Sequence, residues 1–228
     1  MKTNYKILSV GGSIIIPVGG FDIAFLKKFR DLIIAQVKAG QKFILVIGGG
    51  STARVYQKAG KETVNLNNTN LDWLGIYCTH LNAEFVRLLF GDLAHKEVIK
   101  NPNKKITTKK PIIVAAGFEP GCSTDNDAVI LAKTFGVKEI FNLSNVDYVY
   151  TGDPKTNQNA KKLDKVSWAE FRKIVGDKWV PGKNVPFDPV AAKRAEKLKL
   201  KVGFVKGTDL GELGKALSWQ KFQGTVIG

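Results

Sequence analysis

Residues 43–54 read FILVIGGGSTAR, and the fold class can be predicted from this pattern outward. Residues 43–47 form a short apolar run, which is typical of a buried β-strand. The run ends in Gly48, Gly49 and Gly50, and a helix is expected to begin near Ser51, whose side chain can cap it. A strand that passes through a glycine turn into a helix is the building unit of a parallel α/β sheet.

The same unit recurs on both sides of this stretch. Tyr5–Val10 is a strand-like run that ends in Gly11-Gly12-Ser13, with an apolar continuation over residues 14–18, and the strand-like residues 111–116 are followed by a turn around Pro120-Gly121. Further strands are predicted at residues 139–143, 202–205 and, as a final edge strand, 224–227. Helices are predicted at residues 21–39, 71–91, 125–135, 167–175, 191–199 and 210–217, with loops at 62–70, 101–111 and 181–189. This alternation predicts an α/β fold, a three-layer α/β/α sandwich with a mainly parallel central sheet.

The composition is that of a globular protein with a basic surface. The chain has 228 residues, 44% of them apolar, and a formal net charge of +15. A positive charge suits nucleic acid, anionic lipid or small polyanions such as nucleotides, and it also suits a solvated basic surface without a partner. The densest lysine clusters, residues 104–110 and 193–201, lack interleaved aromatic residues, which disfavours nucleic-acid binding.

Cysteine usage and hydropathy indicate a cytoplasmic protein without a membrane segment. Cys78 and Cys122 are far apart and form neither a CxxC pair nor, with His80 and His95, a zinc-ligand pattern. Residues 1–6 are polar and lead directly into a strand, so no signal peptide is expected. No apolar run approaches the length of about 18 residues that a membrane helix requires.

Three glycine-rich turns at strand ends point to a phosphate site. They are Gly11-Gly12-Ser13, Gly48-Gly49-Gly50 and the turn at Pro120-Gly121. Glycine lets the backbone approach a phosphate, and the following helix start offers free N–H groups; a single such turn often only closes a loop. Neither GxxxxGK[ST] nor GxGxxG occurs, so the P-loop and Rossmann interpretations have no motif support.

Five blocks resemble the amino-acid-kinase superfamily and, within it, the uridylate (UMP) kinases of the short, archaeal-like form. The resemblance extends from Ile7 to Ile227. The blocks are ILSVGGSII (7–15), GGGSTAR (48–54), DWLGIYCTHLNA (72–83, the pattern DxxGxxxTxxN), PGCSTDNDA (120–128) and LSNVDYVYTGDP (143–154), followed by VPFDP (185–189) near the expected donor site. It implies one amino-acid-kinase domain over residues 1–228, with an acceptor-side half of about 1–117, a donor-side half of about 118–228 and a seam at residues 117–123.

The resemblance assigns the acceptor, UMP, to residues of the first half and the seam. These are Gly49, Gly50 and Arg54 for the phosphate, Asp72 for the ribose hydroxyls, Gly117 near the base, and Thr124. A guanidinium fork suits a phosphate, and a carboxylate suits a cis-diol. Arg54 could instead be an ordinary surface arginine, and Asp72 could also serve as a helix N-cap.

The resemblance assigns the donor, ATP with Mg²⁺, to the other side. Asp125 is implied as the catalytic residue that organises the transferring phosphoryl group. Asp127 could act there, or it could be a first-turn residue that interacts with the helix dipole. The implied ATP-binding residues are Gly11, Gly12, Ser13, Ser144, Asn145, Tyr150 and Asp153.

Two positions depart from the family pattern. Where many members carry a lysine on the first strand, this chain has Ser9, so another cation such as Lys6 or Lys183 would have to act, or turnover would be slow or absent. Where the family has a glycine, this chain has Tyr148, which is expected to reshape the adenine pocket.

The implied activity is in-line transfer of the γ-phosphoryl group of MgATP to UMP, which yields UDP for pyrimidine nucleotide biosynthesis. Two alternatives stay open: a nucleotide-binding regulator or scaffold with weak or no turnover, and another family member such as isopentenyl phosphate kinase. The resemblance also implies a homo-oligomer, a hexamer of dimers. The apolar face of residues 71–91, with Leu74, Cys78, Leu81, Phe85 and Leu88, could form an interface or belong to the core.

Overall fold

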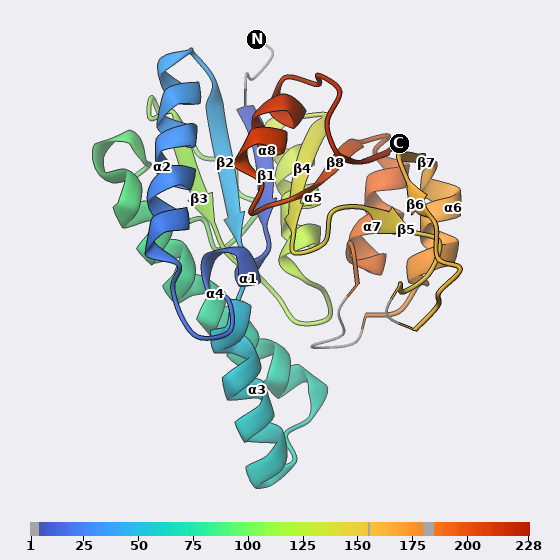
Figure 1. Cartoon of the computed structure of the whole chain (residues 1–228). Helices are drawn as coiled ribbons and strands as arrows, with labels where there is room; N and C mark the ends of the chain where they lie inside the picture. The colour runs from blue at the N-terminus through green and yellow to red at the C-terminus, as the bar shows by residue number, and fades with distance from the viewer. Residues whose placement is uncertain (1–4, 155, 180–184) are drawn as a thin grey trace.

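The computed structural model describes residues 5–154, 156–179 and 185–228, and Lys183 therefore lies outside the described residues. Its central layer is a seven-stranded sheet in the order β3-β2-β1-β4-β8-β9-β7 (Figure 1). The strands are β1 Tyr5–Val10, β2 Lys42–Ile47, β3 Ile112–Ala115, β4 Glu139–Ser144, β7 Lys165–Val166, β8 Lys201–Lys206 and β9 Gly224–Ile227. A separate two-stranded sheet pairs β5 Val149–Tyr150 with β6 Lys162–Leu163.

Neighbouring strands from β3 to β8 run parallel, whereas β9 is antiparallel to β8. The parallel strands are buried on both faces, which explains why their sequences are continuous apolar runs and not alternating ones. In β1, Ile7 packs on one face of the sheet and Leu8 and Val10 pack on the other. The predicted three-layer α/β/α architecture with a mainly parallel sheet is thus confirmed.

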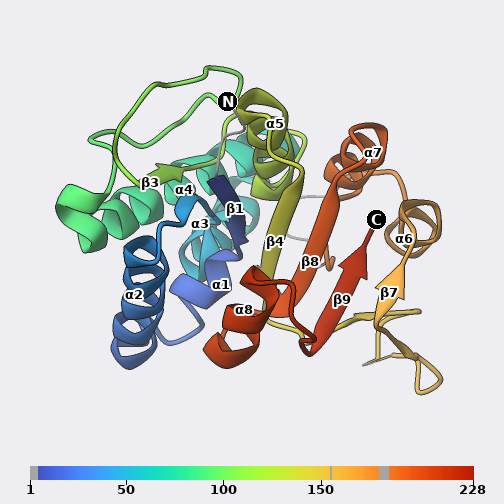
Figure 2. The same ribbon diagram turned by 90° about the horizontal axis from the view of Figure 1, so that it is seen from above.

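Two helical layers cover the sheet (Figure 2). One core contains side chains of α5, α6 and α7, and the opposite core contains side chains of α1, α2, α4 and α8. The helices are α1 Gly12–Ile15, α2 Ile23–Lys38, α3 Gly50–Val64, α4 Asn68–Phe90, α5 Thr124–Phe135, α6 Trp168–Val175, α7 Pro189–Lys197 and α8 Leu210–Leu217, with a 3₁₀ turn at Gly91–Leu93. The helix pair of α3 and the start of α4 projects beyond the rest of the molecule (Figure 1).

Helix ends around α3 and α4 differ from the sequence-based expectation. Gly49 precedes α3 without a side-chain cap, so the predicted cap at Ser51 is wrong; the Ser51 amide donates instead to the carbonyl of Ile16 at 3.0 Å. The predicted loop at residues 62–70 is shorter, because Asn65 ends α3 in the left-handed conformation and the side chain of Asn67 caps α4. These asparagines are helix caps, a role for which their short amide side chains are suited.

Three further expectations change. The apolar continuation after Ser13 begins as the short helix α1. The strand β9 is confirmed, but it is not at the edge, because β7 pairs with its other side. The predicted apolar face of α4 divides: Cys78 is buried, whereas Leu81 and Leu88 are exposed.

Both edges of the large sheet are short or covered. At the outer side of β3, Ala94 and Ile99 form isolated bridges with Ile112 and Ala115. At the other edge, β7 consists of two residues. Within the described residues, no helix combines the length and the hydropathy needed to cross a membrane.

Candidate functional site

A cavity of about 530 Å³ lies at the carboxyl ends of the parallel strands, the usual position for a ligand in such a sheet. It brings together the predicted residues Gly11, Gly12, Ser13, Gly49, Gly50, Arg54, Asp72, Gly117, Thr124, Asp125, Ser144 and Asn145. Tyr150 and Asp153 do not line it. Its size is within the range of known small-molecule sites.

The turns after β1 and β2 pack backbone against backbone. A methyl group on Gly12 would lie 1.9 Å from the amide nitrogen of Gly50, and one on Gly50 would lie 2.6 Å from the carbonyl oxygen of Gly12. Gly50 also has a φ of +65°, which favours glycine. Because these residues are glycines, the two turns can touch at one wall of the cavity. The glycines therefore have a packing role in addition to any contact with a ligand.

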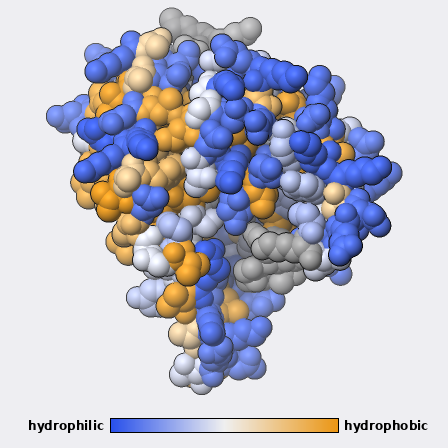
Figure 3. Space-filling view, viewed as in Figure 1, coloured by the Kyte–Doolittle hydropathy of each residue, from blue (hydrophilic) through white to orange (hydrophobic). Residues whose placement is uncertain are grey.

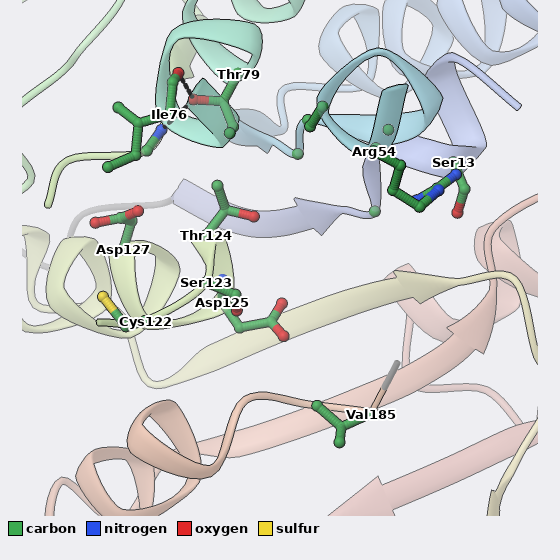
Figure 4. A pocket seen from close by; sticks show the side chains of 18 of the residues that line it. Ser13, Arg54, Ile76, Thr79, Cys122, Ser123, Thr124, Asp125, Asp127 and Val185 are labelled. Atoms are coloured by element: carbon green, nitrogen blue, oxygen red, sulfur yellow. Dashed lines mark hydrogen bonds between the residues drawn. The ribbon is translucent and has the colours of Figure 1, made fainter. Parts of the chain in front are cut away.

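Arg54 lies one turn into α3 and its exposed side chain lines the cavity beside Ser13 (Figure 4). The described residues include no ion-pair partner for its guanidinium group. The start of α3 adds free backbone N–H groups and a partial positive charge at the same wall. This arrangement suits a phosphate, although Arg54 is also as exposed as an ordinary surface arginine.

Asp72 contacts the loop that connects β3 with α5. It lies inside α4, so the proposed additional role as an N-cap is wrong: Asn67 has that role. Its Oδ2 accepts a hydrogen bond from the amide of Gly121 at 2.8 Å. The indole N–H of Trp179 approaches both carboxylate oxygens at 3.3 and 3.4 Å.

Thr79 connects the two sides of this wall. Its hydroxyl oxygen accepts from the amide of Gly117 at 2.8 Å, and its methyl group faces Gly49. One turn later, the side-chain amide of Asn82 donates to the carbonyl oxygens of Gly48 and Gly49 at 2.9 and 3.0 Å. Helix α4 therefore fixes both the triple-glycine turn and the end of β3.

Asp125, in the first turn of α5, is held by three donors from different elements. Its Oδ1 accepts from the Ser9 hydroxyl at 2.7 Å and from the Asn142 amide at 2.8 Å, and its Oδ2 accepts from the backbone N–H of Asp188 at 3.2 Å. Ser9 and Asn142 are paired positions on the neighbouring strands β1 and β4. The carboxylate is thereby fixed at the carboxyl ends of the sheet.

Asp188 organises the loop before α5. Its carboxylate accepts from the amides of Val190 and Ala191, which makes it the cap of α7, and also from the amide of Ser123. Its own backbone N–H donates to Asp125. Through its buried side chain and its backbone N–H, Asp188 thus joins α7, the start of α5 and the Asp125 carboxylate.

Burial shifts the acid–base equilibria at this wall. It raises the pKa of Asp125 to about 6, with a further increase from Asp188 that the hydrogen bond from Ser9 partly offsets. The pKa of Asp127 is raised well above its usual value by burial, although the backbone N–H of Phe118 lowers it and three nearby carboxylates raise it again. Burial likewise raises the pKa of the Cys122 thiol to about 12.

Most charged residues that line the cavity are acidic. Asp72, Glu119, Asp125 and Asp127 line the cavity, and Arg54 is the basic residue among the described lining residues. The expectation that Lys6 could act in place of the family lysine is wrong, because its ammonium group donates to the carbonyl of Leu217 at 2.7 Å, away from the cavity. Where the family pattern has a lysine, this chain thus has Ser9, whose neutral hydroxyl donates a hydrogen bond to Asp125.

The end of β4 forms the opposite wall with Ser144 and Asn145. Beyond it, the Tyr150 hydroxyl donates to Asp147 at 3.0 Å on the small β5–β6 sheet. Tyr148 is buried, and the ammonium group of Lys162 lies 4.9 Å from the centre of its ring. Tyr148 does not line the cavity, and its effect on an adenine pocket stays a prediction.

Sequence reasoning did not assign a contact to Asn142, Trp179 or Asp188. Asn142 was detectable as a polar residue within the apolar strand EIFNLS, where a buried amide requires a partner. Asp188 was detectable as a helix cap directly before Pro189, and the segment was placed near the donor site without a role for the carboxylate. Trp179 had no sequence signal, because its contact with Asp72 joins residues 107 positions apart.

Comparisons with known proteins agree in family and in fold. Residues 4–205 match the amino acid kinase family. The chain is 32% identical over 225 residues to a uridylate kinase of Methanocorpusculum labreanum, covering 97% of this chain and 94% of that protein. It is 34% identical over 207 residues to a uridylate kinase of Sulfolobus acidocaldarius, covering 89% and 90% of the two chains. The crystal structure of uridylate kinase from Archaeoglobus fulgidus superposes with a TM-score of 0.82 at 31% identity and covers 100% of both chains.

Proposed function

The chain belongs to the amino acid kinase family, and on that premise we propose that it transfers the γ-phosphoryl group of ATP to UMP to form UDP. The observation that carries the proposal is the single cavity that joins two glycine turns, Arg54, Asp72 and Asp125 at the carboxyl ends of the strands. This set offers one phosphate site on each side of a fixed carboxylate. Formation of UDP from UMP belongs to pyrimidine nucleotide biosynthesis, and we assign the proposed reaction to it.

The acceptor is held on the side of α3 and α4. The triple-glycine turn with Gly49 and Gly50 offers backbone N–H groups to the UMP phosphate, and Arg54 offers a guanidinium fork. Asp72 accepts the ribose hydroxyls; a carboxylate has about four lone-pair sites, so it can accept them in addition to the Gly121 amide. Gly117 and Thr124 line the cavity close to this acceptor.

The donor is held on the side of β1 and β4. Gly11, Gly12 and Ser13 approach its phosphates, and Ser144 and Asn145 lie toward its nucleoside. Tyr150 and Asp153 lie farther along the same connection and are proposed to contact adenosine. Asp125, fixed by its three donors, orients the groups between the two phosphates, which is the positioning on which phosphoryl transfer depends.

Both substrates are anions, and the described lining supplies one basic side chain against four acidic ones. We therefore expect Mg²⁺ to be required. The described residues contain no group of three or more His, Cys, Asp or Glu side chains that could hold a metal ion, so the ion would arrive with the ATP phosphates. It would supply charge neutralisation at the transferring group.

We propose that the protein is cytoplasmic and forms a homo-oligomer, a hexamer. Support comes from apolar side chains on the outside of α4, where Trp73, Tyr77, Leu81 and Leu88 are exposed, and from Phe21, which packs on Phe85 with ring centres 4.8 Å apart. Figure 3 shows hydrophobic surface over α2 and hydrophilic surface over the side of α6. Light scattering coupled to gel filtration would measure the assembly directly.

A substrate screen tests the activity. Purified protein is given MgATP and, in turn, UMP, CMP, dUMP, AMP, GMP and isopentenyl phosphate, and ADP release is followed. UMP-dependent ADP release with UDP as product is the expected result. Folded protein that releases ADP only with isopentenyl phosphate would identify another activity of the family.

A second candidate function is nucleotide binding without appreciable turnover. The observation that favours it is Ser9, whose neutral hydroxyl donates to Asp125 at the position where the family pattern has a lysine. Calorimetry with UMP and a non-hydrolysable ATP analogue distinguishes the two. Tight binding of both with no UDP formed would favour a regulator, whereas UDP formation excludes it.

A further inference from the structure

One carboxylate oxygen of Asp127 receives no hydrogen bond from the part of the chain that the structure describes. It lies in the first turn of α5, two residues after Asp125, and its side chain is buried. Among the described residues its Oδ1 has no hydrogen-bond partner, whereas the backbone N–H of Phe118 interacts with the carboxyl group. An unpaired buried acceptor costs about 1–3 kcal/mol, so its retention calls for an explanation.

The unpaired oxygen belongs to the cavity. Four buried side-chain atoms of the described residues lack a partner, and they belong to Asn126, Asp127, Arg172 and Trp219. Asp127 is the member of this group that lines the cavity. A first-turn residue that interacts only with the helix dipole gains nothing from being buried without a partner.

Asp127 lies on the opposite side of the cavity from Arg54, which follows the triple-glycine turn Gly48–Gly50 (Figure 4). Thr79 stands between the two: its methyl group faces Gly49, and its hydroxyl oxygen accepts from Gly117. Asp127 is on the Gly117 side, where its carboxyl group interacts with the backbone N–H of Phe118, the residue after Gly117. Its side chain points toward Ile76 and Thr79 of α4 (Figure 4). A nucleotide with its phosphate at Gly49 and its ribose at Asp72 extends its base toward this end.

We propose that Asp127 is a specificity-determining residue whose Oδ1 accepts a hydrogen bond from the N3–H of uracil in the acceptor nucleotide. The proposal rests on the proposed function, because it assumes a mononucleotide with its base at this end of the cavity. Uracil carries a hydrogen on N3, and cytosine carries a lone pair there. With CMP bound, Oδ1 of Asp127 would therefore stay unpaired and would face N3 of cytosine, which is also an acceptor.

The carboxyl group of Asp127 lies in a buried environment. Burial raises the pKa of its carboxyl group well above the usual value. A buried polar group that the wrong substrate leaves unpaired discriminates more strongly than a change in apolar contact.

Two substitutions separate base reading from a structural role. Asp127→Ala removes the acceptor. In Asp127→Asn, the amide oxygen interacts with the Phe118 N–H and the NH₂ group faces the base, so an acceptor becomes a donor that suits N3 of cytosine. Asp92→Asn, an exposed carboxylate on the 3₁₀ turn after α4, is the matched control.

Binding of UMP and CMP is measured by calorimetry for all four proteins, and UDP and CDP formation is followed in parallel. We expect wild type and Asp92→Asn to prefer UMP. Asp127→Ala should lower the preference for UMP by roughly 10- to 100-fold, mainly through UMP affinity, and Asp127→Asn should in addition bind CMP more tightly than wild type does.

Different outcomes test the proposed turnover and the proposed role of Asp127. Wild type that binds UMP but forms no UDP would remove the proposed turnover and leave the binding test intact. An Asp127→Ala or Asp127→Asn protein that is folded and keeps the wild-type ratio of UMP to CMP affinity would overturn the role of Asp127. A wild type that binds neither nucleotide, or that prefers CMP, would overturn it as well.

Discussion

The two ends of the cavity are built in different ways. At the end near α3 and α4, one wall is backbone: the donor-side turn at Gly12 packs directly on the acceptor-side turn at Gly48–Gly50, and the side-chain amide of Asn82 donates to the carbonyl oxygens of Gly48 and Gly49. At the end near β4, the walls are side chains, and the central group, Asp125, is held by hydrogen bonds from Ser9, Asn142 and Asp188.

The two ends should therefore respond differently to substitution. Backbone contacts without intervening side chains leave no room for substitution, so the acceptor end is fixed by packing. The donor end depends on polar contacts that can be removed one at a time, so substitutions there should change chemistry before they change stability. Four experiments test this contrast.

The largest effect is expected for Gly12→Ala. Its methyl group would lie 1.9 Å from the backbone of Gly50, so one of the two turns would have to move. We expect the free energy of unfolding, measured by urea denaturation, to fall by about 3 kcal/mol or more, because backbone cannot yield as a side chain can.

Gly214→Ala is the matched control for this glycine. Gly214 lies within α8, and a methyl group there meets no atom within 4 Å. Replacement of a helical glycine by alanine should be neutral or stabilise by up to about 1 kcal/mol. Equal stability of Gly12→Ala and wild type would contradict the packing of the two turns.

The second effect is on catalysis. Asp125→Asn replaces one of the two acceptor oxygens by a donor that opposes Ser9, Asn142 or Asp188. We expect kcat for UDP formation to fall by roughly 100- to 1,000-fold, with smaller changes in the KM values for ATP and UMP. The exposed Asp164→Asn serves as the control, and an unchanged kcat in Asp125→Asn would remove Asp125 from the site.

The third effect is confined to the acceptor. Arg54→Ala should raise KM for UMP by about 10- to 100-fold and leave KM for ATP nearly unchanged, because the lost guanidinium faces only the UMP phosphate in the proposed arrangement. Lys58→Ala, one turn farther along α3 and exposed, removes the same charge without touching the cavity. A parallel rise in KM for both nucleotides would show that the two ends are not separate.

The smallest effect concerns stability and pH. The pKa of Asp125 is raised from 3.8 in the unfolded chain to about 6 in the folded protein, so the folded state binds its proton more tightly. Its contribution to stability is therefore complete below about pH 4 and is lost as the pH rises through about 6.

Urea denaturation at several pH values between 4 and 7 measures this change, for which about 1–3 kcal/mol is expected from Asp125. In Asp125→Asn this part of the decrease should disappear. A decrease of the same size in wild type and in the variant would assign the pH dependence to other groups, of which Asp127 is the nearest with a raised pKa.

Much of the fold could be predicted from the sequence, because its signals are local. Buried apolar runs such as residues 43–47 end in glycines, and β1 and α8 were predicted with their observed bounds. The asparagines around residue 65 were misread because the same polar residues serve in loops and in helix caps. The strand order, and with it the inner position of β9, depends on pairings between distant segments.

The candidate site follows the same division. Glycine turns and the residues next to them were predicted and do line one cavity. The partners of Asp125 were not predicted, because Ser9 and Asn142 become neighbours only through the pairing of β1 with β4. The importance of Asp127 was likewise hidden, since its sequence position fits an ordinary first-turn acid and only its burial sets it apart.

The covered edge at β3 and the short edge at β7 affect how the protein resists aggregation at high concentration. An open edge strand exposes unpaired N–H and C=O groups and can act as a template for the strand of another molecule. Here the bridges from Ala94 and Ile99 occupy the outer side of β3, and the two-residue β7 offers little length at the other edge. We therefore expect self-association to proceed through the helical surfaces, and the folded chain to resist the strand-to-strand stacking that leads to amyloid.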